Sequence, residues 1–154
     1  MHPKQLKDLI IVPTLRHMDM LSEHAVTLLM GTAAQESRLG HYIAQIQGPA
    51  LGIFQMEPAT EDDIWKNYIE YRPDIQRLID YLAPNDGLHN QLISNLSYAT
   101  AMARLAYWRQ NFDWPEDLMD IPAYGRIWKK FYNTPQGKGT VDEFVENYYR
   151  YCLD

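Results

Sequence analysis

The sequence contains a single cysteine, Cys152, so no internal disulfide can form. We expect this residue to lie on the last helix as a buried apolar side chain. No hydrophobic run approaches the ~20 residues that a membrane-spanning helix needs. Near the N-terminus, Asp8 precedes an apolar run that covers only residues 9–12, too short for the core of a signal peptide. The sequence therefore predicts neither a signal peptide nor membrane insertion.

Positive charge is also scarce. The chain carries 14 Lys and Arg against 20 Asp and Glu, a formal net charge of −6, and no basic stripe stands out. An acidic surface does not attract nucleic acid at long range, so we expect no nucleic-acid partner. The five histidines lack metal-ligand spacing, and no phosphate loop or dinucleotide-binding glycine pattern is present. We therefore expect neither a metal nor a cofactor.

The 154 residues, of which 46% are hydrophobic, suit one globular domain over residues 1–154. Apolar residues mostly recur at helical spacing, which predicts a mainly α fold. Ser22, Thr60 and Thr140 are of the types that cap helix N-termini, and Glu143 completes a capping box with Thr140. The expected helices are 3–11, 22–38, one from Thr60, 73–82, about 90–110, 128–132 and one from Thr140.

Residues 41–58 interrupt the helical pattern. Gly48, Pro49 and Gly52 break the chain, and Ile53-Phe54 favour extended structure. We expect a loop with a small β-ribbon there, beside the end of helix 22–38, which gives an α+β, lysozyme-like class. A turn is expected at 84–87.

Glu36 is the most unusual residue, because it ends a helix that is otherwise apolar nearly all round. Burial and the negative end of the helix dipole both disfavour a charged carboxyl there. A carboxyl that keeps its proton near neutral pH can act as a general acid on a glycosidic oxygen. From this feature alone, a solvated helix end is the simpler interpretation.

The residues that follow favour the general acid. The blocks, in order, are Glu36-Ser37, Gly52-Ile53-Phe54-Gln55, Pro58-Ala59-Thr60, Asn95-Leu96 and Tyr132-Asn133. This order resembles the soluble-type lytic transglycosylases, which share the lysozyme-like fold. Their pattern is Glu-Ser, Gly-Leu-Met-Gln, Pro-x-Thr, Asn-Ile and Ala-Tyr-Asn-Ala-Gly. This chain departs from it at Ile53-Phe54 and at Thr134-Pro135.

The resemblance implies cleavage of peptidoglycan between N-acetylmuramic acid and N-acetylglucosamine. Glu36 would protonate the leaving oxygen and then deprotonate the muramic acid O6 hydroxyl. That hydroxyl would close onto C1 and give a 1,6-anhydro product. One carboxylate suffices, unlike in the two-carboxylate scheme of most glycosidases.

The resemblance also implies supporting roles for the other matched residues. Ser37 and Gln55 would hydrogen-bond the substrate, and Gly52 would let the backbone pass close to it. Tyr132 would hydrogen-bond Glu36 and hold its rotamer. Asn95 and Asn133 complete the expected substrate-binding set. By residue type alone, each role has a structural alternative: Ser37 can bond its own backbone, Gly52 can make a turn, and Tyr132 can be a core aromatic.

Two other functions remain open. A goose-type muramidase would need a second carboxylate to activate water, and Glu57, Glu61, Asp62 and Asp63 are candidates. A solvated first helical turn is the preferred interpretation of that acidic run. Alternatively, the departures from the family pattern suit a non-catalytic, peptidoglycan-binding virion component of the same fold.

The expected partner is therefore the peptidoglycan glycan strand, bound by a monomer. A compact wall-cutting enzyme without a signal peptide resembles phage-encoded proteins. Such an enzyme is made in the cytoplasm and reaches the wall through a holin, inside the virion or through specialised secretion.

Overall fold

The computed structural model describes residues 1–84, 88–133 and 136–153, and it is mainly helical, as predicted. Its N-terminal run joins α1 (Pro3–Gln5), the π-helix η1 (Leu6–Ile11) and α2 (Val12–His17). The helix thus continues six residues beyond the predicted end at Ile11. The wider π turn accommodates Pro13, which has no N–H to donate.

Helix α3 (Glu23–Ser37) carries Glu36 and begins and ends as its sequence predicts. The Ser22 hydroxyl accepts a hydrogen bond from the Ala25 N–H at 3.0 Å, as an N-cap does. At the other end Arg38, Leu39 and Gly40 all have positive φ, at 54°, 57° and 78°. This left-handed turn reverses the chain immediately after Glu36.

The predicted β-ribbon is not confirmed. Residues 41–57 contain two isolated bridges, Ala44 with Leu51 and Leu51 with Met56, and the described residues include no strand. Positive φ angles at Gln47, Gly52 and Gln55 interrupt the extended backbone, so a continuous ladder cannot form.

The middle of the chain forms a second group of helices. They are α4 (Pro58–Asn67), the 3₁₀ turn η2 (Ile69–Tyr71), α5 (Pro73–Leu82), α6 (Leu88–Ser94) and α7 (Leu96–Trp108). Helix 73–82 is confirmed. The predicted cap at Thr60 is wrong, because α4 begins at Pro58 with Glu57 in the N-cap position, which places Thr60 inside the first turn. The expected helix over 90–110 is two helices, because Asn95 caps α7 by accepting a hydrogen bond from the Tyr98 N–H at 2.9 Å. The predicted turn at 84–87 falls mostly outside the described residues.

The C-terminal part holds α8 (Ile121–Trp128), the π-helical turn η3 (Lys129–Asn133) and α9 (Val141–Tyr151). The segment 128–132 is therefore the end of a longer helical run. Thr140 caps α9 through the Glu143 N–H, as predicted. Just after α9, Cys152 is partly buried, and its thiol donates to the Met30 carbonyl oxygen at 3.3 Å.

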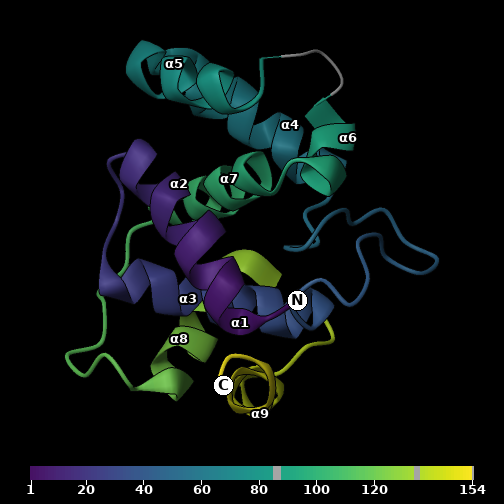
Figure 1. The fold of residues 1–154 in the computed structure, drawn as a ribbon, viewed down its shortest axis with the longest axis vertical. Helices are drawn as coiled ribbons and strands as arrows, with labels where there is room; N and C mark the ends of the chain where they lie inside the picture. The colour runs from purple at the N-terminus through teal and green to yellow at the C-terminus, as the bar shows by residue number, and fades with distance from the viewer. Residues whose placement is uncertain (85–87, 134–135, 154) are drawn as a thin grey trace.

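Two hydrophobic cores meet at α7. One lies among α3, α8, α9 and the N-terminal helices, and the other among α4, α5 and α6. Ala99, Ala103 and Tyr107 of α7 belong to the first core, whereas Met102 and Leu105 belong to the second. Figure 1 shows α7 between these two groups of helices, with the loop of residues 41–57 extending to one side.

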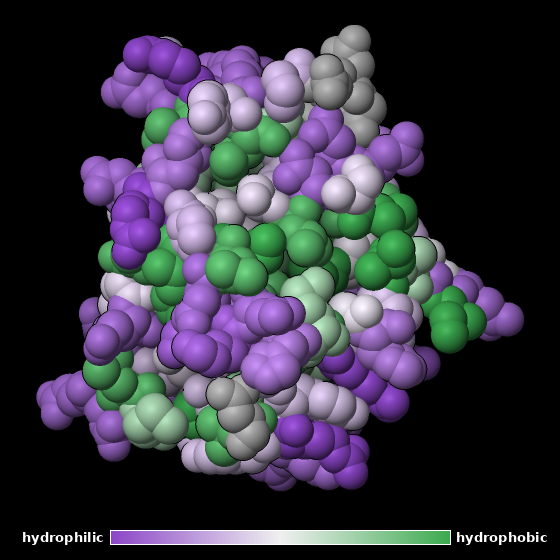
Figure 2. Space-filling view, in the orientation of Figure 1, coloured by the Kyte–Doolittle hydropathy of each residue, from purple (hydrophilic) through white to green (hydrophobic). Residues whose placement is uncertain are grey.

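Apolar and hydrophilic residues are unevenly distributed over the surface. Figure 2 shows apolar residues gathered across the middle of one face, with hydrophilic residues dominating above and below. Of the helices that the structure describes, none has both the length and the hydrophobicity of a membrane span.

Candidate active site

Glu36 occupies the last turn of α3 and is partly buried. Its Oε2 accepts a hydrogen bond from the Trp128 Nε1–H at 2.9 Å. Burial raises the pKa of Glu36 from 4.5 to about 7, while the Trp128 hydrogen bond acts in the opposite direction. Near neutral pH, this carboxyl therefore exists in both its protonated and its ionised form.

Trp128 is fully buried and firmly held. Its ring lies 5.6 Å from that of Phe144, centroid to centroid, and Gly139 packs directly against its edge. Next to it, the Lys129 ammonium donates to the carbonyl oxygens of Gly137 and Gly139, each at 2.7 Å. This packing fixes the indole N–H that binds Glu36.

Two tyrosines lie close enough to Glu36 for its charge to act on them. The rings of Tyr107 and Tyr132 stack at 5.4 Å, and the Tyr107 hydroxyl shares a hydrogen bond of 2.8 Å with Thr32. Burial raises the pKa of both tyrosines well above 10, and the charge of Glu36 adds to the rise. The expected hydrogen bond from Tyr132 to Glu36 is wrong, because the Tyr132 hydroxyl donates to the Phe54 carbonyl oxygen at 2.7 Å.

Ser37 has no exposed surface and cannot contact a substrate directly as it lies. Its hydroxyl donates to the Ile53 carbonyl oxygen at 2.6 Å and accepts from the Gly40 N–H at 2.8 Å. It therefore ties the end of α3 to the loop that follows. Ser37 thus bonds the backbone of the protein, which is the alternative to a substrate contact. The reason is the left-handed turn, which folds the chain back over Ser37.

Gly52 and Gln55 also hold the loop in shape. Gly52 has φ of 81°, and a Cβ there would overlap the Leu92 carbonyl oxygen of α6. Glycine is thus required because the backbone at Gly52 passes close to α6, and not because it passes close to a substrate. Gln55 is 8% exposed, and its Nε2 donates to the Gly52 carbonyl oxygen at 2.9 Å.

The two asparagines make structural contacts as well. The Asn95 side chain caps α7 and also donates to the Leu82 carbonyl oxygen at 2.8 Å, so its polar atoms are occupied within the protein. Asn133 accepts a hydrogen bond from the Lys129 ammonium at 2.8 Å. Among the predicted substrate-binding residues, Gln55 and Tyr132 both line one cavity.

The acidic residues 57–63 at the start of α4 are expected to be exposed to solvent, and this holds for only some of them. Glu57 and Asp62 are exposed, but Glu61 is 1% exposed. Glu61 accepts a hydrogen bond from the Tyr98 hydroxyl at 2.6 Å and contacts His89 Nδ1. Its burial is predictable only once α6 and α7 are known to pack over it.

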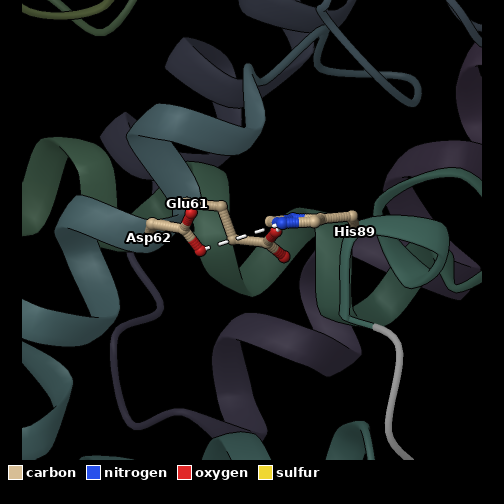
Figure 3. Close-up of side chains that lie close together, drawn as sticks. All are labelled: Glu61, Asp62 and His89. Carbon is tan, nitrogen blue, oxygen red and sulfur yellow. Dashed lines mark hydrogen bonds and ion pairs between the residues drawn. The ribbon is translucent and has the colours of Figure 1, made fainter.

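Figure 3 shows Glu61 and Asp62 on α4 facing His89 on α6. One ligand atom from each lies within 4.8 Å of the others, so these residue types could hold a cation. However, Nδ1 of His89 contacts Glu61 while Nε2 lies 3.9 Å from Asp62. The imidazole of His89 therefore has a carboxylate beside each of its nitrogens and joins α6 to α4.

Trp128 and Tyr107 are the residues at Glu36 that sequence reasoning missed. Aromatic residues are usually core, and 92 residues separate Trp128 from Glu36.

Comparisons of the chain with family models, curated proteins and solved structures found no match.

Proposed function

We propose that this protein is a peptidoglycan lytic transglycosylase with Glu36 as its sole general acid and base. The observation that carries the proposal is the partly buried Glu36 carboxyl, whose pKa of about 7 suits both proton transfers. A group used first as acid and then as base works best when its pKa lies near the working pH.

In the proposed reaction, Glu36 Oε1–H protonates the glycosidic oxygen as the C1–O4 bond breaks. The resulting carboxylate then takes the proton of the muramic acid O6 hydroxyl. The O6 lone pair forms the new bond to C1, which leaves a 1,6-anhydro end and regenerates the protonated acid. No water enters, and the glycan is neither oxidised nor reduced.

Trp128 supports this cycle by positioning the carboxyl. Its N–H binds Oε2, which leaves Oε1 for the substrate. Burial is the main cause of the raised pKa of Glu36, and the Trp128 hydrogen bond opposes it. A carboxyl whose pKa lies near neutral pH can serve as acid and then as base, which is what a single-carboxylate mechanism requires.

Mass spectrometry of purified peptidoglycan after digestion tests the proposal. We expect 1,6-anhydro muropeptides from the unmodified protein, and none from Glu36→Gln. Glu116→Gln is the matched control, since Glu116 is exposed and lies outside the site.

Two other results would contradict the proposal. Products with reducing ends, one water heavier, would identify the muramidase. Absence of any product from several wall types would favour the non-catalytic peptidoglycan-binding role.

A further inference from the structure

Another cavity lies away from Glu36 and is lined by the first half of α3 and the end of α9. Its volume is about 580 Å³, and pockets that enclose whole small-molecule ligands measure ~300–1,000 Å³. Met30 is the last α3 residue of its wall, and Glu36 follows six positions later, about 9 Å further along the helix. We call this cavity the α3–α9 groove, and its wall includes Val26, Met30, Leu118, Met119, Tyr148 and Cys152.

The α3–α9 groove gathers apolar side chains that water reaches. Four residues of its wall are each between 37% and 55% exposed: Leu21, Leu118, Met119 and Leu153. Single exposed apolar residues are normal on a protein surface, whereas a cluster of them around a cavity marks a binding surface. Among the described residues of the wall, Tyr148 carries the one aromatic ring. An aliphatic ligand therefore suits the groove better than one that stacks on rings.

The hydroxyl of Tyr148 is a polar group without a partner in this apolar wall. The residue is 8% exposed, and its hydroxyl makes no hydrogen bond to any described residue. Its oxygen is still within reach of a ligand, because Arg109 Nε is the one polar side-chain atom of the described residues that is both sealed from solvent and unpartnered. A buried tyrosine hydroxyl normally finds a hydrogen-bond partner, so this one points to a ligand that supplies it.

Other uncharged polar side chains of the wall already have partners. The Thr27 hydroxyl pairs with that of Tyr124, and the Cys152 thiol donates to the Met30 carbonyl oxygen at 3.3 Å. Burial raises the pKa of Tyr148 to about 12, so its hydroxyl keeps the proton at neutral pH and can either donate or accept. It is therefore the polar contact that the wall leaves for a ligand.

The charges at the α3–α9 groove select an uncharged ligand. Lys7 and Glu23 are its charged residues among those described, and both are exposed. A ligand carboxylate attracted by Lys7 would be repelled by Glu23, and a ligand ammonium group would meet the reverse. Since the two charges offset one another, an uncharged polar end is favoured over either ion.

We propose that the α3–α9 groove binds an aliphatic chain with an uncharged, oxygen-bearing end, which hydrogen-bonds the Tyr148 hydroxyl. The chain packs against the Leu, Met and Val side chains of the wall, and its removal from water supplies most of the affinity. An alcohol hydroxyl and an ester carbonyl oxygen both match a tyrosine hydroxyl, so the ligand class is that of fatty alcohols and acyl esters. The site goes beyond the proposed function, because its wall contains no residue of the candidate active site.

An NMR titration of the full chain, labelled with ¹³C at its methionine methyl groups, tests the proposal. Met30 and Met119 line the groove, whereas Met102 lies in the second core and is the internal reference. The ligands are 1-octanol, methyl octanoate, octanoate and octylammonium, which share one chain and differ in its end. Tyr148→Phe removes only the hydroxyl. Tyr149→Phe, at a neighbour that is 48% exposed and outside the wall, is the matched control.

Both uncharged ligands should shift the Met30 and Met119 signals saturably and leave the Met102 signal unmoved. Each should bind more tightly than octanoate and octylammonium. Tyr148→Phe should weaken their binding about fivefold, as the loss of one hydrogen bond does, whereas Tyr149→Phe should leave it unchanged. A loss confined to 1-octanol identifies the hydroxyl as the preferred end, and a loss confined to methyl octanoate identifies the carbonyl.

Three results would overturn the inference: no saturable shift at Met30 and Met119, equal affinities of Tyr148→Phe and its parent, or tighter binding of either charged ligand. Movement of the Met119 signal with protein concentration alone would also overturn it, because a second copy of the chain would then occupy the groove. None of these results bears on peptidoglycan digestion by the Glu36 site, so the groove and the proposed function stand or fail separately.

Discussion

Replacing Glu36 with Gln should stabilise the protein at alkaline pH, even though it abolishes the proposed activity. Burial raises the pKa of Glu36 from 4.5 to about 7, so the folded state holds the proton more tightly than the unfolded state. At ~1.4 kcal/mol per pH unit, this rise corresponds to about 3 kcal/mol, an upper value because the side chain is partly exposed.

The sign of the pH dependence follows from proton binding. Below pH 4.5 both states are protonated, and the Glu36 pKa shift has no effect on the free energy of unfolding. Between pH 4.5 and about 7 the folded state keeps a proton that the unfolded state has lost, so that free energy falls as pH rises. Above about pH 7 the full penalty is present. The amide introduced by Glu36→Gln does not titrate, so that variant should escape this loss.

Urea denaturation of both chains from pH 4 to pH 9 measures the difference. Glu36→Gln should gain up to about 3 kcal/mol relative to the unmodified protein between pH 4.5 and pH 8, on top of any constant offset. The exposed Glu116→Gln variant should show no such change. A difference between Glu36→Gln and its parent that stays flat across this range would refute the burial argument.

Further predictions concern the groups that hold the site. Trp128→Phe removes the donor to Oε2, so the pKa of Glu36 should rise further above 7, as ¹³C NMR titration of the Glu36 carboxyl would detect. An unmoved titration would contradict the hydrogen bond. Gly52→Ala should cost at least about 2 kcal/mol in urea denaturation, because a Cβ would meet a carbonyl oxygen at positive φ, whereas Gly48→Ala meets only a side chain. Equal costs for the two glycine variants would count against the close approach. Ser37→Ala leaves the Ile53 carbonyl oxygen without its hydroxyl donor and should cost about 1–3 kcal/mol. An unchanged midpoint there would show that the hydroxyl bond is dispensable.

The sequence predicts most strongly where one residue and its near neighbours decide the outcome. Ser22 and Thr140 are capping residues whose partners lie three residues along, and both caps form as expected. The β-ribbon fails because residue type does not reveal the positive φ angles at Gln47 and Gln55. A side chain of either residue favours a right-handed or extended backbone, so only the folded loop imposes that conformation.

In the candidate site, too, the features that depend on neighbouring residues could be predicted, and those that depend on distant contacts could not. The apolar sequence of α3 identifies Glu36 as unusual, because that apolar surface lies within the same helix. The hydrogen bond from Trp128 depends on a contact made across 92 residues, which no local pattern encodes. The expected contact of Ser37 with substrate fails because the left-handed turn that buries it comes from Arg38 and Leu39, residues that seldom adopt positive φ.

The position of α7 within two cores has a consequence for unfolding. Tyr107 packs with α3 and α8 on one side, while Leu105, two residues earlier, packs with α4 and α5 on the other. Because α7 contributes residues to both cores, loss of packing in one core displaces α7 and weakens the other core. The two halves should therefore melt in a single cooperative transition. A substitution such as Ile79→Ala, deep in the second core, should therefore lower the thermal midpoint seen by Trp65 and by Trp128 equally. Loss of activity in such a variant would then reflect the unfolded fraction of the whole chain.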